Sequence, residues 1–148
     1  MHSREYPFHD GHLASISIAD SSAVLGLKQA DGNEFTMTLT GVEALNVDGF
    51  RLGNTILALR AISGGCPPDG LMSAQEMRGA MDALFPAPHG SAAAHHHEAH
   101  TRFIASRLAR LSRGEATLVM LAPAYGAELC AYCLAIDLQG RPPAQREG

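Results

Sequence analysis

The stretch that decides the fold of this chain runs from Glu34 to Thr40 and reads EFTMTLT. Its apolar residues alternate strictly with glutamate and threonine, and this period of two is typical of a β-strand with one face in water. Similar short runs precede and follow it, and turn signals interrupt the pattern at Asp31-Gly32, at Gly41 and at Gly53-Asn54. The pattern therefore predicts a β-meander over residues 11–62.

Five strands are predicted inside this meander, at residues 12–19, 23–29, 35–39, 45–47 and 55–62. The Asp31-Gly32 pair predicts a tight hairpin, because glycine accepts the positive φ that such a turn requires. The segment from Thr55 to Ile62 is apolar on both faces, which predicts the most buried strand of the set. Residues 1–8 are predicted to be a loose lead-in, since Pro7 discourages regular structure.

A helical insertion is predicted over residues 73–113. Ser73 and Glu76 have the spacing of a capping box, in which each side chain bonds the backbone N–H of the other residue. An apolar stripe at helical spacing follows, and a proline ends this first helix. A second helix is predicted over residues 93–112, with Gly114 as its C-terminal stop.

Two closing strands are predicted in residues 115–138, at 117–121 and 128–138, and residues 139–148 are predicted to be a loose tail. The order of elements is strands, two helices and strands again, without the alternating βαβ units that indicate a parallel sheet. We therefore predict a single α+β domain over residues 1–148. Its antiparallel sheet is expected to curl into a half-barrel, with the two helices inserted before the last two strands.

The composition indicates a globular protein. With 148 residues, 46% of them hydrophobic and 18% charged, the chain is long enough and apolar enough to bury one core. The net charge of -4 at pH 7 disfavours a nucleic-acid partner, which requires a basic surface. No apolar run reaches the length of a membrane span and the first ten residues do not read as a signal peptide. A cytoplasmic protein without a membrane partner is expected.

The three cysteines, Cys66, Cys130 and Cys133, are an odd number and provide no disulfide framework. Cys130 and Cys133 have the spacing of a redox motif, but that motif requires a helix N-terminus and these residues lie in a strand-like run. Alternation along a strand places their side chains on opposite faces. We interpret both as small buried residues, and Cys66 as an incidental loop cysteine.

The most conspicuous candidate site is the cluster from His95 to His100, near the start of the second predicted helix. His96 and His100 are four residues apart, so both imidazoles project from one helix face and can share a divalent metal such as zinc or nickel. His97 is a candidate third ligand. The cluster lacks the H-E-x-x-H order of a metalloprotease. The alternative interpretation is an Ala-rich helix start whose histidines capture metal only adventitiously.

No other arrangement of residues predicts catalysis. The sequence contains no nucleophile elbow and no glycine-rich phosphate loop. His9-Asp10 lies before a strand, where we interpret it as part of a loop. Four arginines of the second helix are interpreted as a solvated face, with an acidic partner as the alternative: Arg102, Arg107, Arg110 and Arg113.

Several fragments together resemble a family of small uncharacterised bacterial proteins of mostly β structure, some of which are similar to immunity proteins in toxin–antitoxin neighbourhoods. The fragments are Phe8-His9-Asp10-Gly11, Leu39-Thr40-Gly41-Val42, Phe50 to Ile56, and Pro123 to Glu128 with Cys133. The resemblance implies no catalytic residues and favours a protein-binding role.

The leading functional hypothesis is a non-enzymatic module that binds a protein partner or forms a homo-oligomer. An open meander offers exposed strand edges for such pairing. One alternative is a metal-binding protein or metal-dependent hydrolase that uses His96 and His100, with His97 or His9 as a third ligand, the last of these in a composite site with the His9–His12 segment. A second alternative is a small-molecule binder whose ligand occupies the mouth of the half-barrel.

Overall fold

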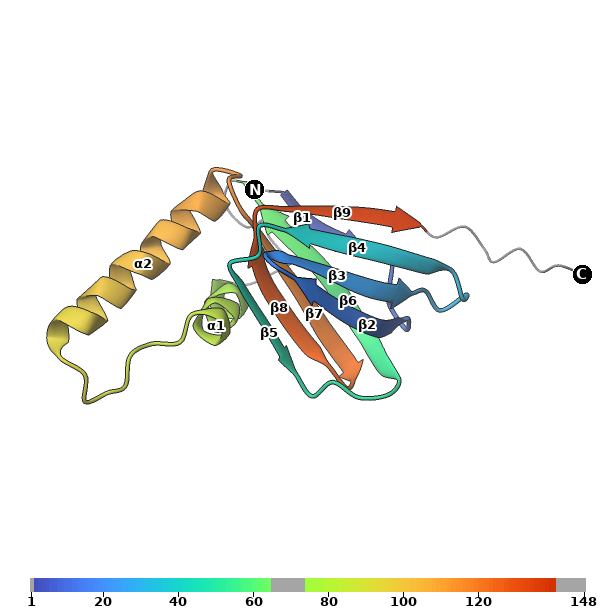
Figure 1. The fold of residues 1–148 in the computed structure, drawn as a ribbon, viewed down its shortest axis with the longest axis horizontal. Coiled ribbons are helices and arrows are strands. Elements are labelled where there is room, and N and C mark those ends of the chain that lie inside the picture. The colour runs from blue at the N-terminus through green and yellow to red at the C-terminus, as the bar shows by residue number, and fades with distance from the viewer. Residues whose placement is uncertain (1, 65–73, 141–148) are drawn as a thin grey trace, which may run out of the picture.

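The computed structural model describes residues 2–64 and 74–140, which form nine β-strands and two α-helices (Figure 1). In chain order they are β1 (His2–Tyr6), β2 (His12–Ala19), β3 (Ser22–Lys28), β4 (Glu34–Thr40), β5 (Ala44–Asp48), β6 (Asn54–Ser63), α1 (Ala74–Leu84), α2 (Ala94–Ser112), β7 (Thr117–Tyr125), β8 (Glu128–Cys133) and β9 (Ala135–Gly140). The two helices therefore lie between β6 and β7 along the chain.

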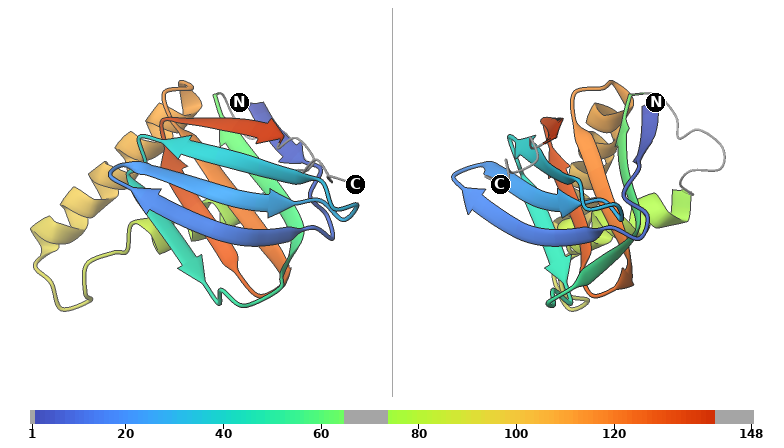
Figure 2. Two further views of the ribbon diagram at one scale, coloured as in Figure 1. Left: turned by 45° about the vertical axis from the view of Figure 1, so that its right-hand side comes forward. Right: turned by 90° about the vertical axis from the view of Figure 1, so that its right-hand side faces the viewer.

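All nine strands belong to one antiparallel sheet with the order β5-β8-β7-β6-β2-β3-β4-β9, and β1 pairs with β6. The sheet curls into two facing layers, β2-β3-β4-β9 and β5-β8-β7-β6 (Figures 1 and 2). The layers meet at one corner where Leu13 of β2 pairs with Asn54 of β6. At another corner the chain itself crosses between layers, from β4 to β5 and from β8 to β9. The predicted α+β class with a curled antiparallel sheet is confirmed.

Only part of the predicted meander pairs in chain order. β2, β3 and β4 do so, and Gly32 (φ 95°) forms the predicted hairpin between β3 and β4. β5 instead pairs with β8, at the far edge of the sheet. At Gly41, which follows β4, φ is 61° and a Cβ would lie 2.5 Å from the Leu134 side chain, so this bend requires glycine. The chain bends at this glycine and enters the other layer.

Residues 128–138 form parts of two strands rather than the single predicted one. β8 pairs with β5 and β7, whereas β9 pairs with β4. The break falls at Leu134, whose N–H donates to the Thr40 carbonyl at 2.9 Å. β9 continues to Gly140, so the start of the predicted loose tail is a strand. The rest of that tail lies outside the described residues.

Residues 2–6, predicted as part of a loose lead-in, form β1. This strand pairs with β6 from His2 opposite Ser63 to Tyr6 opposite Leu59. Pro7 follows the last paired residue, so its missing N–H removes no ladder hydrogen bond. The side chains of Tyr6 and Phe8 are buried, and the burial of two aromatic rings explains why this segment is ordered.

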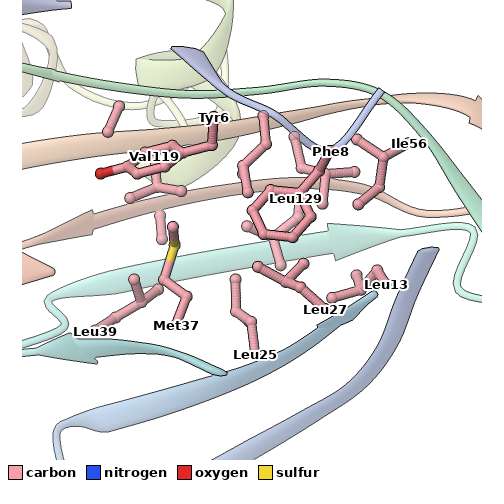
Figure 3. Close-up of a cluster of buried hydrophobic side chains, with 14 of the residues drawn as sticks. Tyr6, Phe8, Leu13, Leu25, Leu27, Met37, Leu39, Ile56, Val119 and Leu129 are labelled. Atoms are coloured by element: carbon pink, nitrogen blue, oxygen red, sulfur yellow. The ribbon is translucent and has the colours of Figure 1, made fainter. Parts of the chain in front are cut away.

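The main hydrophobic core lies between the two layers, as Figure 3 shows. Leu25, Met37 and Leu39 project into it from one layer, while Val119 and Leu129 project from the other. Phe8 inserts at the open side, with its ring edge-on to Phe35 at a centroid distance of 5.3 Å. The sequence contains no tryptophan, so aliphatic side chains and one methionine fill most of this space.

A second core lies on the outer face of β6, β7 and β8, beneath the helices. The α1 stripe of Met77, Met81 and Leu84 packs on Leu118 and Tyr132, as the helical spacing of its apolar residues predicts. β6 contributes to both cores, with Ile56 and Leu59 facing inward and Ile62 facing the helices. The predicted capping residue Ser73 lies outside the described residues.

The helix α2 is attached to the sheet through its C-terminal half. The Tyr132 hydroxyl donates to the Arg107 carbonyl at 2.8 Å, and the Arg107 guanidinium binds the Glu43 carboxylate with Nε at 2.7 Å from Oε1. The helix ends before Gly114 (φ 75°), whose N–H donates to Leu111, as predicted. Its N-terminal half extends beyond the edge of the sheet (Figure 1).

Candidate functional site

The histidine cluster lies on the first two turns of α2, where the helix extends away from the sheet (Figure 1). The Nε2 atom of His100 lies 2.8 Å from the Phe85 carbonyl, which is a hydrogen bond only if Nε2 carries the proton. His96 is exposed and its ring stacks near that of His95, with centroids 4.0 Å apart. His97 is half-buried.

Within residues 2–64 and 74–140, no three histidine, cysteine or acidic side chains come together in a way that could hold a metal ion. His96, His97 and His100 are therefore not joined by a further ligand from another element. In the tautomer in which Nε2 of His100 donates to the Phe85 carbonyl, only Nδ1 remains for a metal. The metal hypothesis stays a prediction with a two-histidine site at most.

The second histidine cluster lies far from the first. His9 and Asp10 form an exposed pair, with Nδ1 and Oδ2 3.1 Å apart, in the loop between β1 and β2. Asp10 has a φ of 62°, and its N–H donates to the Ile56 carbonyl at 2.9 Å. This loop lies at the end of the sheet opposite the start of α2 (Figures 1 and 2). The structure thus creates no composite site between the two clusters.

Cys130 and Cys133 lie on opposite faces of β8, as the alternation predicts. Cys130 belongs to the core beneath the helices and Cys133 to the core between the layers. Burial raises the pKa of each thiol to about 11. Both are therefore protonated at neutral pH and lack the thiolate that redox chemistry requires. Cys66 lies outside the described residues.

The arginines of α2 are largely engaged within the chain. Arg107 and Arg110 both contact Glu43, with Arg110 Nη1 3.8 Å from Oε2. Arg113 pairs with Glu115 at 3.0 Å. The charge that a nucleic acid or an acidic partner would need is thus mostly compensated by neighbouring carboxylates.

The most organised surface feature is the end of the sheet where the β5–β6 loop meets the β7–β8 turn. Asn54, at the start of β6, is 1% exposed and joins three segments. Its Oδ1 accepts the N–H of Arg51 at 2.7 Å and the N–H of Ala127 at 3.0 Å, and its Nδ2 donates to the Leu13 carbonyl at 3.2 Å. One buried side chain therefore fixes the loop, the turn and β2 together.

Glycines allow these segments to approach one another. Gly126 has a φ of 87°, and a Cβ at this position would overlap Oδ1 of Asn54. Gly49 also has positive φ and packs against the Gly126 carbonyl. Close to these glycines, the carbonyl of Gly11 accepts the Ile56 N–H at 2.9 Å. This bond attaches the β1–β2 loop to the end of the sheet where Asn54 lies.

Three of the four fragments that carry the family resemblance converge here: residues 8–11, 50–56 and 123–128. Sequence reasoning treated Gly53-Asn54 only as a turn signal. It could not identify Asn54 as a buried junction, because two of its three partners are 41 and 73 residues distant.

Around this junction the surface is unusually apolar. Four large side chains form what we call the apolar tip: Phe50, Leu52, Leu57 and Tyr125, with exposed fractions of 47%, 98%, 48% and 58%. They come from the β5–β6 loop, from β6 and from the end of β7, which share one end of the molecule (Figure 1). Tyr125 is opposite Thr55 in the register of β6 and β7.

The charges near the apolar tip are mainly acidic. Asp48 ends β5 and is opposite Glu128 in the register of β5 and β8, while Asp10 lies in the adjoining loop. Arg51 is the basic residue of the β5–β6 loop. Three carboxylates thus lie on these segments with Arg51, and Lys28 lies opposite His12 at the start of β2.

The chain matches no family model, no curated protein and no solved structure. The resemblance to small bacterial β-proteins therefore stays a prediction. Neither described helix is long and apolar enough to cross a membrane.

Proposed function

We propose that this protein is a non-enzymatic binding module that recognises a protein partner through the apolar tip. The observation that carries the proposal is the position of Leu52, which is 98% exposed on a loop whose backbone is held by the buried Asn54. An isolated exposed leucine is common on protein surfaces. Here two large apolar side chains stand on the held loop and two more stand on the adjoining strands β6 and β7, and several exposed apolar side chains at one end of a molecule are characteristic of an interaction site.

The fixed backbone supports strong binding because it reduces the entropy lost on association. A mobile loop would have to be ordered when the partner binds, at a cost of roughly 0.5–1.5 kcal/mol for each immobilised side chain. Here Arg51 and Ala127 are already held by Asn54. Phe50 and Tyr125 supply the aromatic anchors that are enriched at binding hot spots.

The charge distribution selects the kind of partner. Asp10, Asp48 and Glu128 lie on segments next to the apolar tip, and these carboxylates favour a partner whose apolar recess is bordered by lysine or arginine. A second copy of this chain would bring the same carboxylates together, and like charges oppose that contact. We therefore favour a different protein over a homodimer.

Site-specific photo-crosslinking in the native host tests the proposal. A benzoylphenylalanine at position 52 is expected to trap one protein, and the same residue at position 18 serves as the control. Ile18 is 65% exposed but lies at the opposite end of β2 from the apolar tip. The trapped protein is then purified, and its dissociation constant is measured by calorimetry.

In that reconstituted complex, Leu52→Ala and Phe50→Ala are each expected to weaken binding by roughly 10-fold or more, as hot-spot truncations do. Added salt is expected to slow association, because the carboxylates attract basic groups. Identical crosslinks from positions 52 and 18, or crosslinks to the chain itself alone, would exclude a different protein as the partner of this surface.

A further inference from the structure

A hollow on the surface lies between α1 and the outer face of the sheet. Its volume is about 400 Å³, within the range of pockets that hold small organic molecules. Its floor is formed by β5, β8, β7 and β6, and α1 forms one wall. We refer to it as the α1 groove.

The floor of the α1 groove is a single row of side chains that crosses four strands. Arg60 is opposite Met120, Met120 is opposite Cys130, and Cys130 is opposite Asn46. Because residues paired across adjacent strands project from the same face, these four side chains line up beneath α1. Polar groups stand at both ends of the row and two sulfur-containing side chains lie at its centre.

The groove is hollow because α1 presents only small residues over the centre of this row, while its Glu76 reaches Arg60 at the β6 end. Met77, Met81 and Leu84 keep the helix above the neighbouring apolar row. Gly79 and Ala83 face the groove instead, and a Cβ placed on Gly79 would meet no atom within 4 Å. The cavity therefore follows from two small residues on a helix that is held away from the sheet.

The charges of the α1 groove are unevenly placed. At the β6 side, Arg60 Nη1 lies 3.2 Å from Glu76 Oε2, so the basic group is matched by a carboxylate. Glu128 contributes a second carboxylate at the β8 side. Burial, followed by the negative charge of Glu128, raises the pKa of the Cys130 thiol to about 11, and a hydrogen bond with the Asn46 side chain acts in the opposite direction.

We propose that the α1 groove is a binding site for a small organic amine, with the ammonium group beside Glu128 and an aromatic body over Met120 and Cys130. Ammonium–carboxylate hydrogen bonds are among the stronger polar contacts, and they strengthen where water is partly excluded. Methionine sulfur makes favourable contacts with aromatic rings. An organic anion would meet the Glu128 carboxylate without a basic group to offset it at that side of the groove.

None of the four apolar-tip side chains lines the α1 groove, and Glu128 is the residue that enters both proposals. The small-molecule titration needs no protein partner, so its outcome is separate from that of the crosslinking. Tryptamine, tryptophol and indole-3-propionate test the amine proposal, since they share an indole body and differ in charge. Each is titrated into the full chain labelled with ¹⁵N and with ¹³C at the methionine methyl groups. Tryptamine is expected to bind with a dissociation constant on the order of 1 mM or below.

The methyl signal of Met120 is expected to shift on tryptamine binding, whereas that of Met37, buried between the two layers, stays unchanged. Glu128→Gln is expected to weaken tryptamine at least fivefold and to leave tryptophol unaffected. Gly79→Leu is expected to abolish binding by filling the groove, and Gly79→Ala is the matched control that keeps it. If Gly79→Leu does not fold, Ala83→Leu fills the same space.

The proposal is overturned if the three indoles bind equally, since the carboxylate would then play no part. It is also overturned if none of them shifts Met120 at 10 mM, or if the groove-filling variant binds tryptamine as the wild type does. Selective binding of indole-3-propionate would reverse the charge assignment and reject an amine site.

Discussion

The buried Asn54 provides the sharpest test of this structure. Replacing it with alanine removes one acceptor that serves two backbone N–H groups and one donor that serves a backbone carbonyl. The N–H of Arg51 belongs to an exposed loop, where water can replace the lost bond. The N–H of Ala127 and the carbonyl of Leu13 belong to buried residues and lose their partner.

Each buried polar group left unsatisfied costs about 1–3 kcal/mol. Two such groups predict that Asn54→Ala lowers the free energy of unfolding by about 2–6 kcal/mol, with about 4 kcal/mol as the central value. This is a large part of the 5–15 kcal/mol that stabilises a typical domain. With a urea m-value of about 2 kcal/mol/M, the midpoint of unfolding falls by about 2 M.

The assay is urea unfolding followed by circular dichroism, together with amide hydrogen exchange of the folded protein. Exchange at Ala127 is expected to accelerate even in the absence of urea. Asn33→Ala is the matched control, because its side-chain bond to Asp31 is exposed, and it is expected to change stability by less than about 0.5 kcal/mol. A loss below about 1 kcal/mol for Asn54→Ala would refute the role of this side chain as a buried junction.

Three further predictions concern glycines and thiols. Gly126→Ala is expected to destabilise the fold by at least about 2 kcal/mol more than Gly53→Ala in urea unfolding, because both have positive φ but only the first adds a clash with a buried side chain. Equal losses of stability in the two variants would show that backbone strain alone accounts for the effect. In the folded protein at pH 8, Cys130 and Cys133 are expected to resist alkylation by iodoacetamide. Mass spectrometry measures this labelling in a variant in which Cys66 is replaced by serine. Burial raises the pKa of both thiols from 9 to about 11, so the thiols of the unfolded chain ionise at a lower pH than those of the folded protein. The free energy of unfolding is therefore expected to fall as the pH rises from about 9 to about 11. Labelling at the rate of an unfolded reference would contradict this burial. Gly79→Ala is expected to raise the thermal midpoint, since it adds up to about 1 kcal/mol of helix propensity without a clash, and an unchanged or lower midpoint would contradict the open space seen there.

The elements that local patterns specify were predicted closely. The alternation in residues 34–40 corresponds to β4, and the hairpin before it depends on the positive φ of Gly32. The second helix was predicted over residues 93–112 and spans Ala94–Ser112. In each case the determining contacts lie within a few residues of one another, so the sequence pattern contains them.

The strand partners were not predictable in the same way. β5 was expected to continue the meander, yet it pairs with β8 because Gly41 bends the chain around Leu134, which lies 93 positions later. β1 was missed because its order comes from pairing with β6 and from the burial of Phe8 between distant strands. Neither cause leaves a local signal.

The candidate sites also differ in whether their residues are close together in the sequence. The histidine cluster was visible in the sequence because its members are adjacent, and among the described residues no histidine, cysteine or carboxylate completes a group of three with it. The apolar tip and the α1 groove were invisible, because each is assembled from strands and loops that meet only after folding.

By itself the sequence determined most of the strands, both helices and the opposite orientation of Cys130 and Cys133, since a period of two or 3.6 residues depends only on neighbouring residues. Only the tertiary structure decided which edges pair, where Asn54 finds its partners and where α1 leaves a hollow over Met120. Those outcomes depend on contacts between residues far apart in the chain, which form when the two layers of the sheet close over one core.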